Sequence, residues 1–168
     1  GLDSPELAKD IDWVKDTTAA VNKLYQDELK NISPSSPPKE INLAISRMVD
    51  QMNALMLKVA TVRAYLHSFI ATDSFNKKAL QLGSQFDQVM VGVENVSVLL
   101  EAWVGQFKDQ LPAVLALGNS AGEHTFPITE MAEQSQYLMS EKEEVLASEL
   151  GLSGARAWTK LQGTVTSQ

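Results

Sequence analysis

The sequence predicts an all-α protein, an antiparallel bundle of three long helices followed by shorter helices. Apolar residues recur in alternating steps of four and three along long stretches, which is the seven-residue pattern of packed helices. No stretch alternates apolar and polar residues for long enough to predict a sheet. Further apolar residues lie beside the repeats, which favours a bundle over a two-stranded coiled coil. We place the three long helices at about 4–31, 39–72 and 74–110.

The first helix is predicted to begin at Ser4, which can cap it, with Pro5 at the first helical position, where a missing N–H costs nothing. Its repeat has Thr18 at one position, and the apolar members are Leu7, Ile11, Val14, Val21 and Tyr25. The segment 32–38 contains three prolines, so we expect it to break the helix and form a short, stiff linker.

The second and third helices carry the most regular repeats. The second has Ile41, Ile45, Met48, Met52, Leu55, Val59, Val62, Leu66 and Phe69; the third has Leu82, Phe86, Val89, Val93, Val96, Leu100, Trp103 and Phe107. A turn with capping residues is expected at 72–74. At 1.5 Å per residue each of these helices is about 50 Å long. Short connections make neighbouring helices antiparallel.

After residue 111 the pattern changes to shorter pieces. Pro112, a glycine-containing loop at 118–122 and Pro127 separate them. We expect a helix over 128–138, which is shorter than any of the first three.

A capping box opens the next predicted helix. Ser140 and Glu143 have the spacing at which each can satisfy an unpaired backbone amide of the other. This helix should run to about Leu150 and stop at Gly151. A last helical segment is expected over 155–164.

Length and composition narrow the class of protein. A chain of 168 residues has the size of one domain, 1–168, with a long-helix part (1–111) and a short-helix part (112–168). It contains no cysteine, which excludes thiolate zinc sites and fits a cytoplasmic location. The net charge of −7 argues against a nucleic-acid partner. No strictly apolar stretch approaches the roughly 20 residues of a membrane span, so we expect no membrane partner.

The two histidines are the first candidates for metal binding. A metallopeptidase site typically uses HExxH, in which two histidines one turn apart hold zinc and the glutamate acts as base. His67, beside the repeat of the second helix, and His124, in a loop, lack that spacing, so we favour structural or solvated roles. Serine-nucleophile motifs are absent, and Gly118–Gly122 lacks the GK[ST] of a phosphate-binding loop.

Four glutamates near the C-terminus form a second candidate group: Glu141, Glu143, Glu144 and Glu149. Acidic residues in the first turn of a helix interact favourably with its dipole. We therefore prefer a solvated helix face to a carboxylate site.

Met48, Met52 and Met56 form a third group. Methionines are typical of adaptable binding surfaces, although at repeat positions they more often belong to the core, which we favour. Asn31 and Asn95 begin N-x-S glycosylation patterns, which matter only in a secreted protein. The sequence thus predicts no catalytic, cofactor-binding or metal-binding residue.

Two segments near the C-terminus resemble a known family. Residues 137–147 read YLMSEKEEVLA, and residues 150–161 read LGLSGARAWTKL. They are similar to the N-terminal region of oligoendopeptidase F and its relatives, where L-S-E-x-E-E-x-L-A-x-L precedes a glycine, a small residue and A-W-x-x-L. Within 65–79, the residues Ala71-Thr-Asp73 resemble the family's turn between two long helices.

The resemblance implies a parent protein that is a zinc-dependent peptidase acting on short peptides. The HExxH motif and zinc ligands of the family lie in a later catalytic domain and have no match here. The resemblance therefore implies that this chain is a non-catalytic N-terminal domain, a fragment that forms a wall or lid of the peptide cleft. Its partners would be its own catalytic domain and a short peptide, with zinc as a cofactor of the parent only.

Composition and periodicity alone allow an alternative. The chain fits equally a stand-alone helical interaction module that assembles through its 3.5-residue repeats. For the peptidase fragment, apolar surface that the catalytic domain normally covers would lead us to expect weak self-association, whereas a tight dimer that buries the repeats would favour the interaction module.

Overall fold

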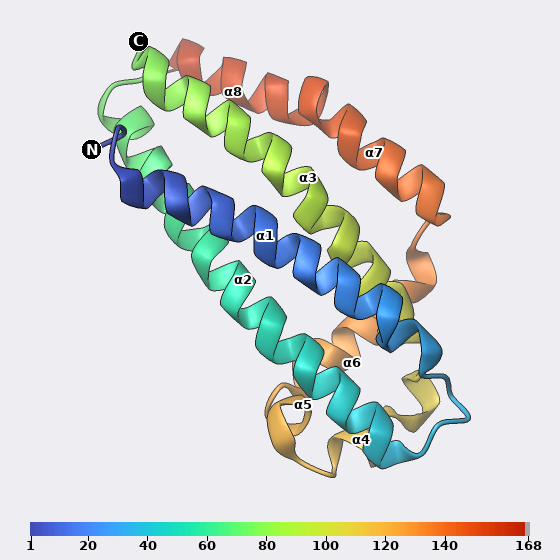
Figure 1. The fold of residues 1–168 in the computed structure, drawn as a ribbon. Coiled ribbons are helices and arrows are strands. Elements are labelled where there is room, and N and C mark those ends of the chain that lie inside the picture. Colours follow the sequence, from blue (N-terminus) through green and yellow to red (C-terminus); the bar gives the residue numbers. More distant parts are fainter. Residues whose placement is uncertain (167–168) are drawn as a thin grey trace.

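The computed structural model describes residues 1–166 and confirms the all-α class, with no strand in that range. Three long helices lie side by side and run alternately in opposite directions (Figure 1). They are α1 (Pro5–Asp27), α2 (Pro38–Thr72) and α3 (Lys77–Gly105). The predicted antiparallel bundle is therefore confirmed.

Shorter helices follow the bundle. One group gathers at the end of the bundle where α2 begins: α4 (Leu111–Leu115), α5 (Asn119–Glu123) and α6 (Thr125–Gln134) (Figure 1). The last two, α7 (Glu141–Ser153) and α8 (Ala155–Thr166), run back along α3 (Figure 1). Single 3₁₀ turns follow α1, α3 and α6, at Leu29–Asn31, Lys108–Gln110 and Ser135–Tyr137.

Side-chain caps fix two of the helix starts. The hydroxyl of Ser4 accepts a hydrogen bond from the Leu7 N–H at 3.2 Å, as the sequence predicts. The side chain of Asn76 accepts one from the Ala79 N–H at 3.0 Å, so α3 begins after Asn76 and not at residue 74. Asp73 explains the later start of α3. Its carboxylate accepts a hydrogen bond from the Phe75 N–H at 3.0 Å and thereby holds the residues before Asn76 in a turn.

The first and third helices end earlier than predicted. The first stops at Asp27 and not at residue 31, since Glu28 leaves the helical backbone conformation (φ −125°, ψ −61°). The third stops at Gly105 and not at residue 110, and Phe107 marks the change (φ −99°, ψ 6°). In both cases the chain continues into a 3₁₀ turn, a common way for a helix to tighten at its end.

The predicted repeats form the core. Most members of the second and third repeats are buried, including Phe107 just beyond the end of α3: Ile41, Ile45, Met48, Leu55, Val59, Val62, Leu66, Phe86, Val93, Val96, Leu100, Trp103 and Phe107. Helix α1 packs against both of these helices, an arrangement that the sequence left open. One core cluster extends into α4, α5 and α6, the other lies between the three long helices, and Met52 packs against both.

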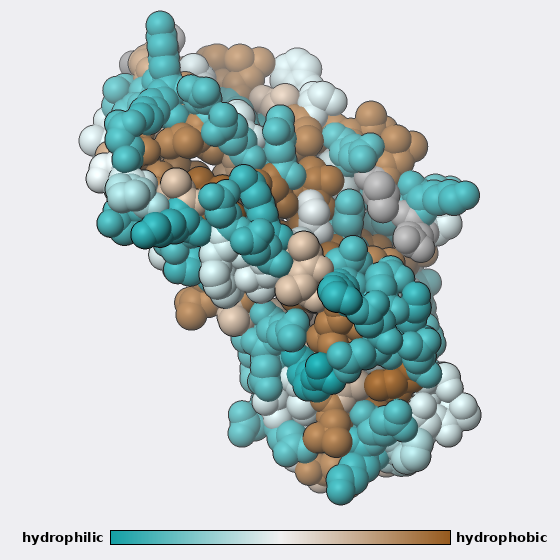
Figure 2. Space-filling model, in the orientation of Figure 1, coloured by the Kyte–Doolittle hydropathy of each residue, from teal (hydrophilic) through white to brown (hydrophobic). Residues whose placement is uncertain are grey.

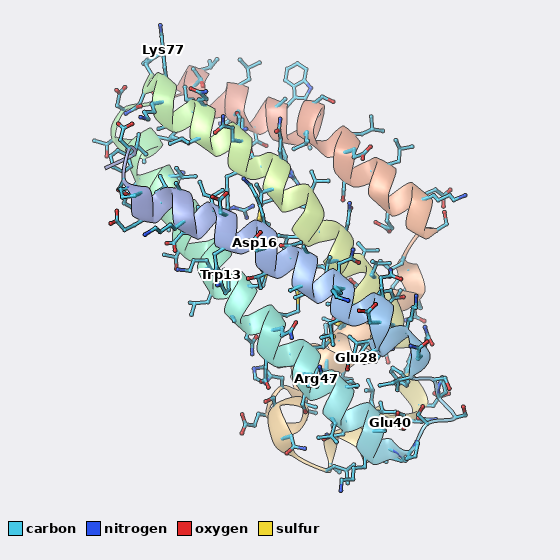
Figure 3. The ribbon with its side chains drawn as sticks, viewed as in Figure 1. Trp13, Asp16, Glu28, Glu40, Arg47 and Lys77 are labelled. Carbon is cyan, nitrogen blue, oxygen red and sulfur yellow. The ribbon has the colours of Figure 1, made fainter. Side chains whose placement is uncertain are left out.

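Exposed ion pairs lie along the contact between α1 and α2. Glu28 and Arg47 face each other in Figure 3 and form an ion pair at 2.5 Å. Lys58 pairs with Asp10 at 2.7 Å and lies 5.9 Å from the ring centre of Trp13. Each such exposed pair contributes at most about 1 kcal/mol. The apolar contacts therefore provide most of the stability of the bundle.

The loop predicted at 118–122 is wrong, because most of it is helix α5. Gly118 (φ 81°) and Asn119 (φ 59°) have left-handed backbone conformations that let the chain enter α5. Gly122 lies so close to the preceding helix that a Cβ there would be 2.8 Å from the Leu115 carbonyl oxygen. Tertiary contact with α2 overrides the local preference of this glycine-containing segment for a loop.

The remaining boundaries shift by a few residues. The helix predicted over 128–138 is α6, at Thr125–Gln134; Pro127 lies in its first turn, where no backbone N–H is required. The predicted stop at Gly151 is also wrong, since α7 runs through it to Ser153. The last helix begins at Ala155 as predicted and is described to Thr166.

By length and composition, α2 could cross a membrane: an 18-residue window has a mean hydropathy of 1.2, and 22% of that window is buried. This qualifies the expectation of no membrane partner. A single helix of this kind is weak evidence, because core helices of soluble proteins pass the same test. The packing of α2 against α1, α3 and α5 accounts for its apolar repeat.

Candidate functional site

Helix α8 contacts the bundle through polar side chains. Arg156 of α8 pairs with Glu94 of α3, and Lys160 of α8 lies 2.5 Å from Asp87 of α3. The amine of Lys160 also lies 3.3 Å from the Ser84 hydroxyl. No described side chain of α7 or α8 is buried. This polar contact is the reverse of the usual arrangement, in which a helix buries an apolar face.

The apolar side chains of α7 and α8 point elsewhere and form an apolar stripe, composed of Leu146, Leu150, Trp158, Leu161 and Val165. Leu146 and Leu150 are four residues apart on one face of α7, and Trp158, Leu161 and Val165 are three and four residues apart on one face of α8. Trp158 is 71% exposed and Leu161 is 52% exposed. Apolar side chains reach the surface over this edge of the molecule (Figure 2). Exposed apolar helix faces of this kind are typical of an interaction surface.

The apolar stripe includes the sequence that resembles oligoendopeptidase F. Trp158 and Leu161 are the tryptophan and leucine of A-W-x-x-L, and Leu146 belongs to the preceding motif. Within residues 1–166 these side chains therefore do not build the core of the bundle.

The glutamates at the start of α7 have structural roles. The predicted capping box is present: the Ser140 N–H and hydroxyl donate to the Glu143 carboxylate at 2.9 and 2.6 Å, which lowers the pKa of Glu143. The ionised Glu143 carboxylate contributes its full stabilisation of the fold above the ordinary glutamate pKa. This contribution is lost as the pH falls through the lowered pKa of Glu143. Glu144 accepts the Met139 N–H at 2.9 Å, and Glu149 is exposed. The Glu141 side chain lies outside the described part.

The two histidines lie apart. His67 is on the exposed side of α2, beside a surface hollow that α8 also lines. His124 joins α5 to α6: its Nδ1 lies 2.9 Å from the Ser120 carbonyl oxygen and its Nε2 lies 3.1 Å from the Asn53 amide. Since a carbonyl oxygen only accepts, we assign the ring proton to Nδ1. Among the described residues, no group of three His, Cys, Asp or Glu side chains could hold a metal ion.

A methionine pocket lies between α2, α3 and α6. It has a volume of about 260 Å³ and is lined by Met48, Met52, Met56 and Met131 together with other apolar side chains. Only Met48 of these is fully buried, while Met56 is 45% exposed. The core role favoured for the methionines of α2 therefore holds for Met48 but not for Met56.

Four polar side chains line the pocket: Asn53, Ser97, Glu101 and His124. Burial raises the pKa of Glu101, and the negative charge of Glu144 raises it further. The Glu101 carboxyl group therefore binds its proton more tightly in the folded chain than in the unfolded chain. The contribution of Glu101 to stability is most favourable below the ordinary glutamate pKa and falls as the pH rises through the raised value.

The sequence interpretation missed Glu101, although a signal for it exists. Asp87, Glu94 and Glu101 follow one another at seven-residue intervals, each directly after a buried repeat position of α3. We call these three residues the acidic row. The first two pair with Lys160 and Arg156 of α8, whereas Glu101 forms no ion pair or hydrogen bond with any side chain that the structure describes.

Comparison with protein families, with curated proteins and with solved structures finds no match to this chain. The fold therefore defines the chain as an all-α helical bundle, and its function rests on the sites described above.

Proposed function

We propose that this chain is a non-catalytic helical domain of a zinc oligopeptidase, forming a wall or lid of the peptide cleft. One observation carries the proposal: the motif side chains Trp158 and Leu161 lie exposed on the apolar stripe of a helix that contacts its own bundle through ion pairs. A catalytic domain of the same protein would cover this stripe. The resemblance of residues 137–161 to oligoendopeptidase F names that domain.

In this arrangement the chemistry belongs to the catalytic domain, which supplies zinc and the general base. The long helices of this chain would limit access to the cleft, so that short peptides enter and folded proteins do not. A bundle with a continuous buried core suits such a role, because a wall must keep its shape to select by size.

The proposal predicts that the chain by itself binds no zinc stoichiometrically and does not hydrolyse short peptides. Zinc titration calorimetry and a quenched fluorescent peptide assay measure both. The gene on the 3′ side of codon 168 provides the positive test, and we expect an open reading frame that encodes HExxH. A tight, stoichiometric zinc site in this chain, or a stop codon directly after codon 168, would contradict the proposal.

A stand-alone interaction module remains the second candidate, because the apolar stripe also suits a partner from another chain. Both candidates predict weak self-association of the isolated chain through the stripe. We expect the double substitution Trp158→Ser with Leu161→Ser to abolish this self-association, which sedimentation equilibrium measures. The free energy of unfolding should change by no more than about 0.5 kcal/mol, because both side chains are exposed.

A matched control replaces an exposed aromatic residue and an exposed leucine outside the stripe, Phe126→Ser with Leu57→Ser. This variant should associate as the original chain does. If the stripe variant still associates, or if the control variant loses association, the stripe is not the contact surface. Because the core repeats are already buried within the single chain, a tight dimer through the stripe would favour the interaction module.

A further inference from the structure

We propose that the methionine pocket binds a small organic cation, an ammonium group on a compact apolar body such as a single aromatic ring, with Glu101 as its ion-pair partner. The proposal concerns a site within this chain and does not depend on the peptidase assignment. Three features of the pocket carry it: its size and lining, its uncompensated carboxylate, and a free acceptor at its edge.

The size and lining of the pocket select a compact apolar body. Its volume of about 260 Å³ exceeds that of an engineered cavity of roughly 150 Å³ that binds benzene, and lies below the roughly 300–1,000 Å³ of sites for drug-sized ligands. Methionine side chains adapt their shape to a ligand, and their sulfur atoms interact favourably with aromatic rings. Met52, Met56 and Met131 are only partly buried, so a ligand can reach them.

The charge at the pocket selects a cation. The acidic row of α3 has three members, and α8 supplies a basic partner to two of them, Asp87 and Glu94. Opposite the third, α7 supplies Glu144, whose negative charge acts on Glu101. Glu101 thus faces a half-buried site without a cation partner among the described residues, and a bound ammonium would provide the missing charge.

The edge of the pocket offers a second acceptor. The Asn53 amide nitrogen lies 3.1 Å from Nε2 of His124, the ring nitrogen that we assign as the acceptor. This contact orients the Asn53 side chain and leaves its carbonyl oxygen without a partner among the described residues. An ammonium group has three N–H donors, which the Glu101 carboxylate and this oxygen can share.

The test uses the whole chain with ¹³C-labelled methionine methyl groups and 2-phenylethylamine, which is protonated at pH 7. We expect saturable shifts of the Met52, Met56 and Met131 methyl signals, with a dissociation constant on the order of 1 mM. The methyl signal of Met139, an exposed residue outside the pocket, should not move.

Two comparisons separate cation recognition from apolar binding. The neutral analogue 2-phenylethanol should bind about tenfold more weakly than the amine, and Glu101→Gln should reduce the affinity for the amine by a similar factor. Glu40→Gln, which removes an exposed carboxylate at the start of α2 (Figure 3), should leave the affinity for the amine unchanged.

Three results would overturn the proposal: no saturable methyl shift, equal affinities for the amine and the alcohol, or unchanged affinity for the amine in the Glu101→Gln chain. The Met90 methyl signal, from a buried residue of α3, verifies that each variant is folded.

Discussion

Replacing Trp103 with alanine should lower the free energy of unfolding by about 3–5 kcal/mol, which is the typical cost of removing a large aromatic side chain from a core. Trp103 is 1% exposed, and its ring packs edge-on against Phe107, with 5.1 Å between the ring centres. The side chain belongs to the cluster that joins the long helices to α4, α5 and α6. Its loss would leave a cavity where these elements meet. Chemical denaturation followed by circular dichroism measures the effect.

The chain provides a matched control in Trp158. The same substitution there removes the same atoms from a side chain that is 71% exposed, so stability should change by no more than about 0.5 kcal/mol. Trp103→Phe should cost less than Trp103→Ala, because the indole N–H has no hydrogen-bond partner among the described residues and phenylalanine buries no such group. Similar losses at Trp103 and Trp158 would contradict this account of the core.

The sequence predicts the long helices well for a physical reason. In α2 and α3, residues that contact a neighbouring helix recur every three or four positions. The spacing of apolar residues in the sequence therefore indicates directly which side chains are buried. The Ser4 cap and the Ser140–Glu143 box are equally local, since each involves residues three positions apart. Patterns of this kind need no knowledge of the rest of the chain.

The features that the sequence does not predict depend on distant contacts. Helix α5 forms in a glycine-containing segment because α2 supplies hydrogen-bond partners to it, among them the Ser46 hydroxyl, which accepts the Ala121 N–H at 3.1 Å. The acidic row of α3 is visible in the sequence, but which of its members finds a basic partner depends on how α7 and α8 lie along α3. The methionine pocket likewise needs Met131 of α6 beside α2.

Asn42 provides the most direct test of that long-range dependence. Its side chain is 1% exposed and donates to the carbonyl oxygens of Val114 and Gly118 at 2.9 and 3.0 Å. It also accepts a hydrogen bond from the Asn119 side chain at 2.7 Å. One buried amide on α2 thus satisfies the end of α4 and the turn into α5, where Gly118 and Asn119 have positive φ.

Asn42→Ala should therefore lower the free energy of unfolding by about 2–4 kcal/mol, because buried carbonyl groups lose their donors and a small cavity is left. Asn42→Asp should cost at least as much, since it places an acceptor or a charge where two carbonyl oxygens require donors. The control is Asn31→Ala, which removes one exposed hydrogen bond to the Asp27 carbonyl and should cost no more than about 0.5 kcal/mol. Hydrogen exchange adds a local measurement: in Asn42→Ala the amides of α5 should exchange faster than those of α3. Uniform loss of protection, or none, would show that Asn42 does not hold α5 in place.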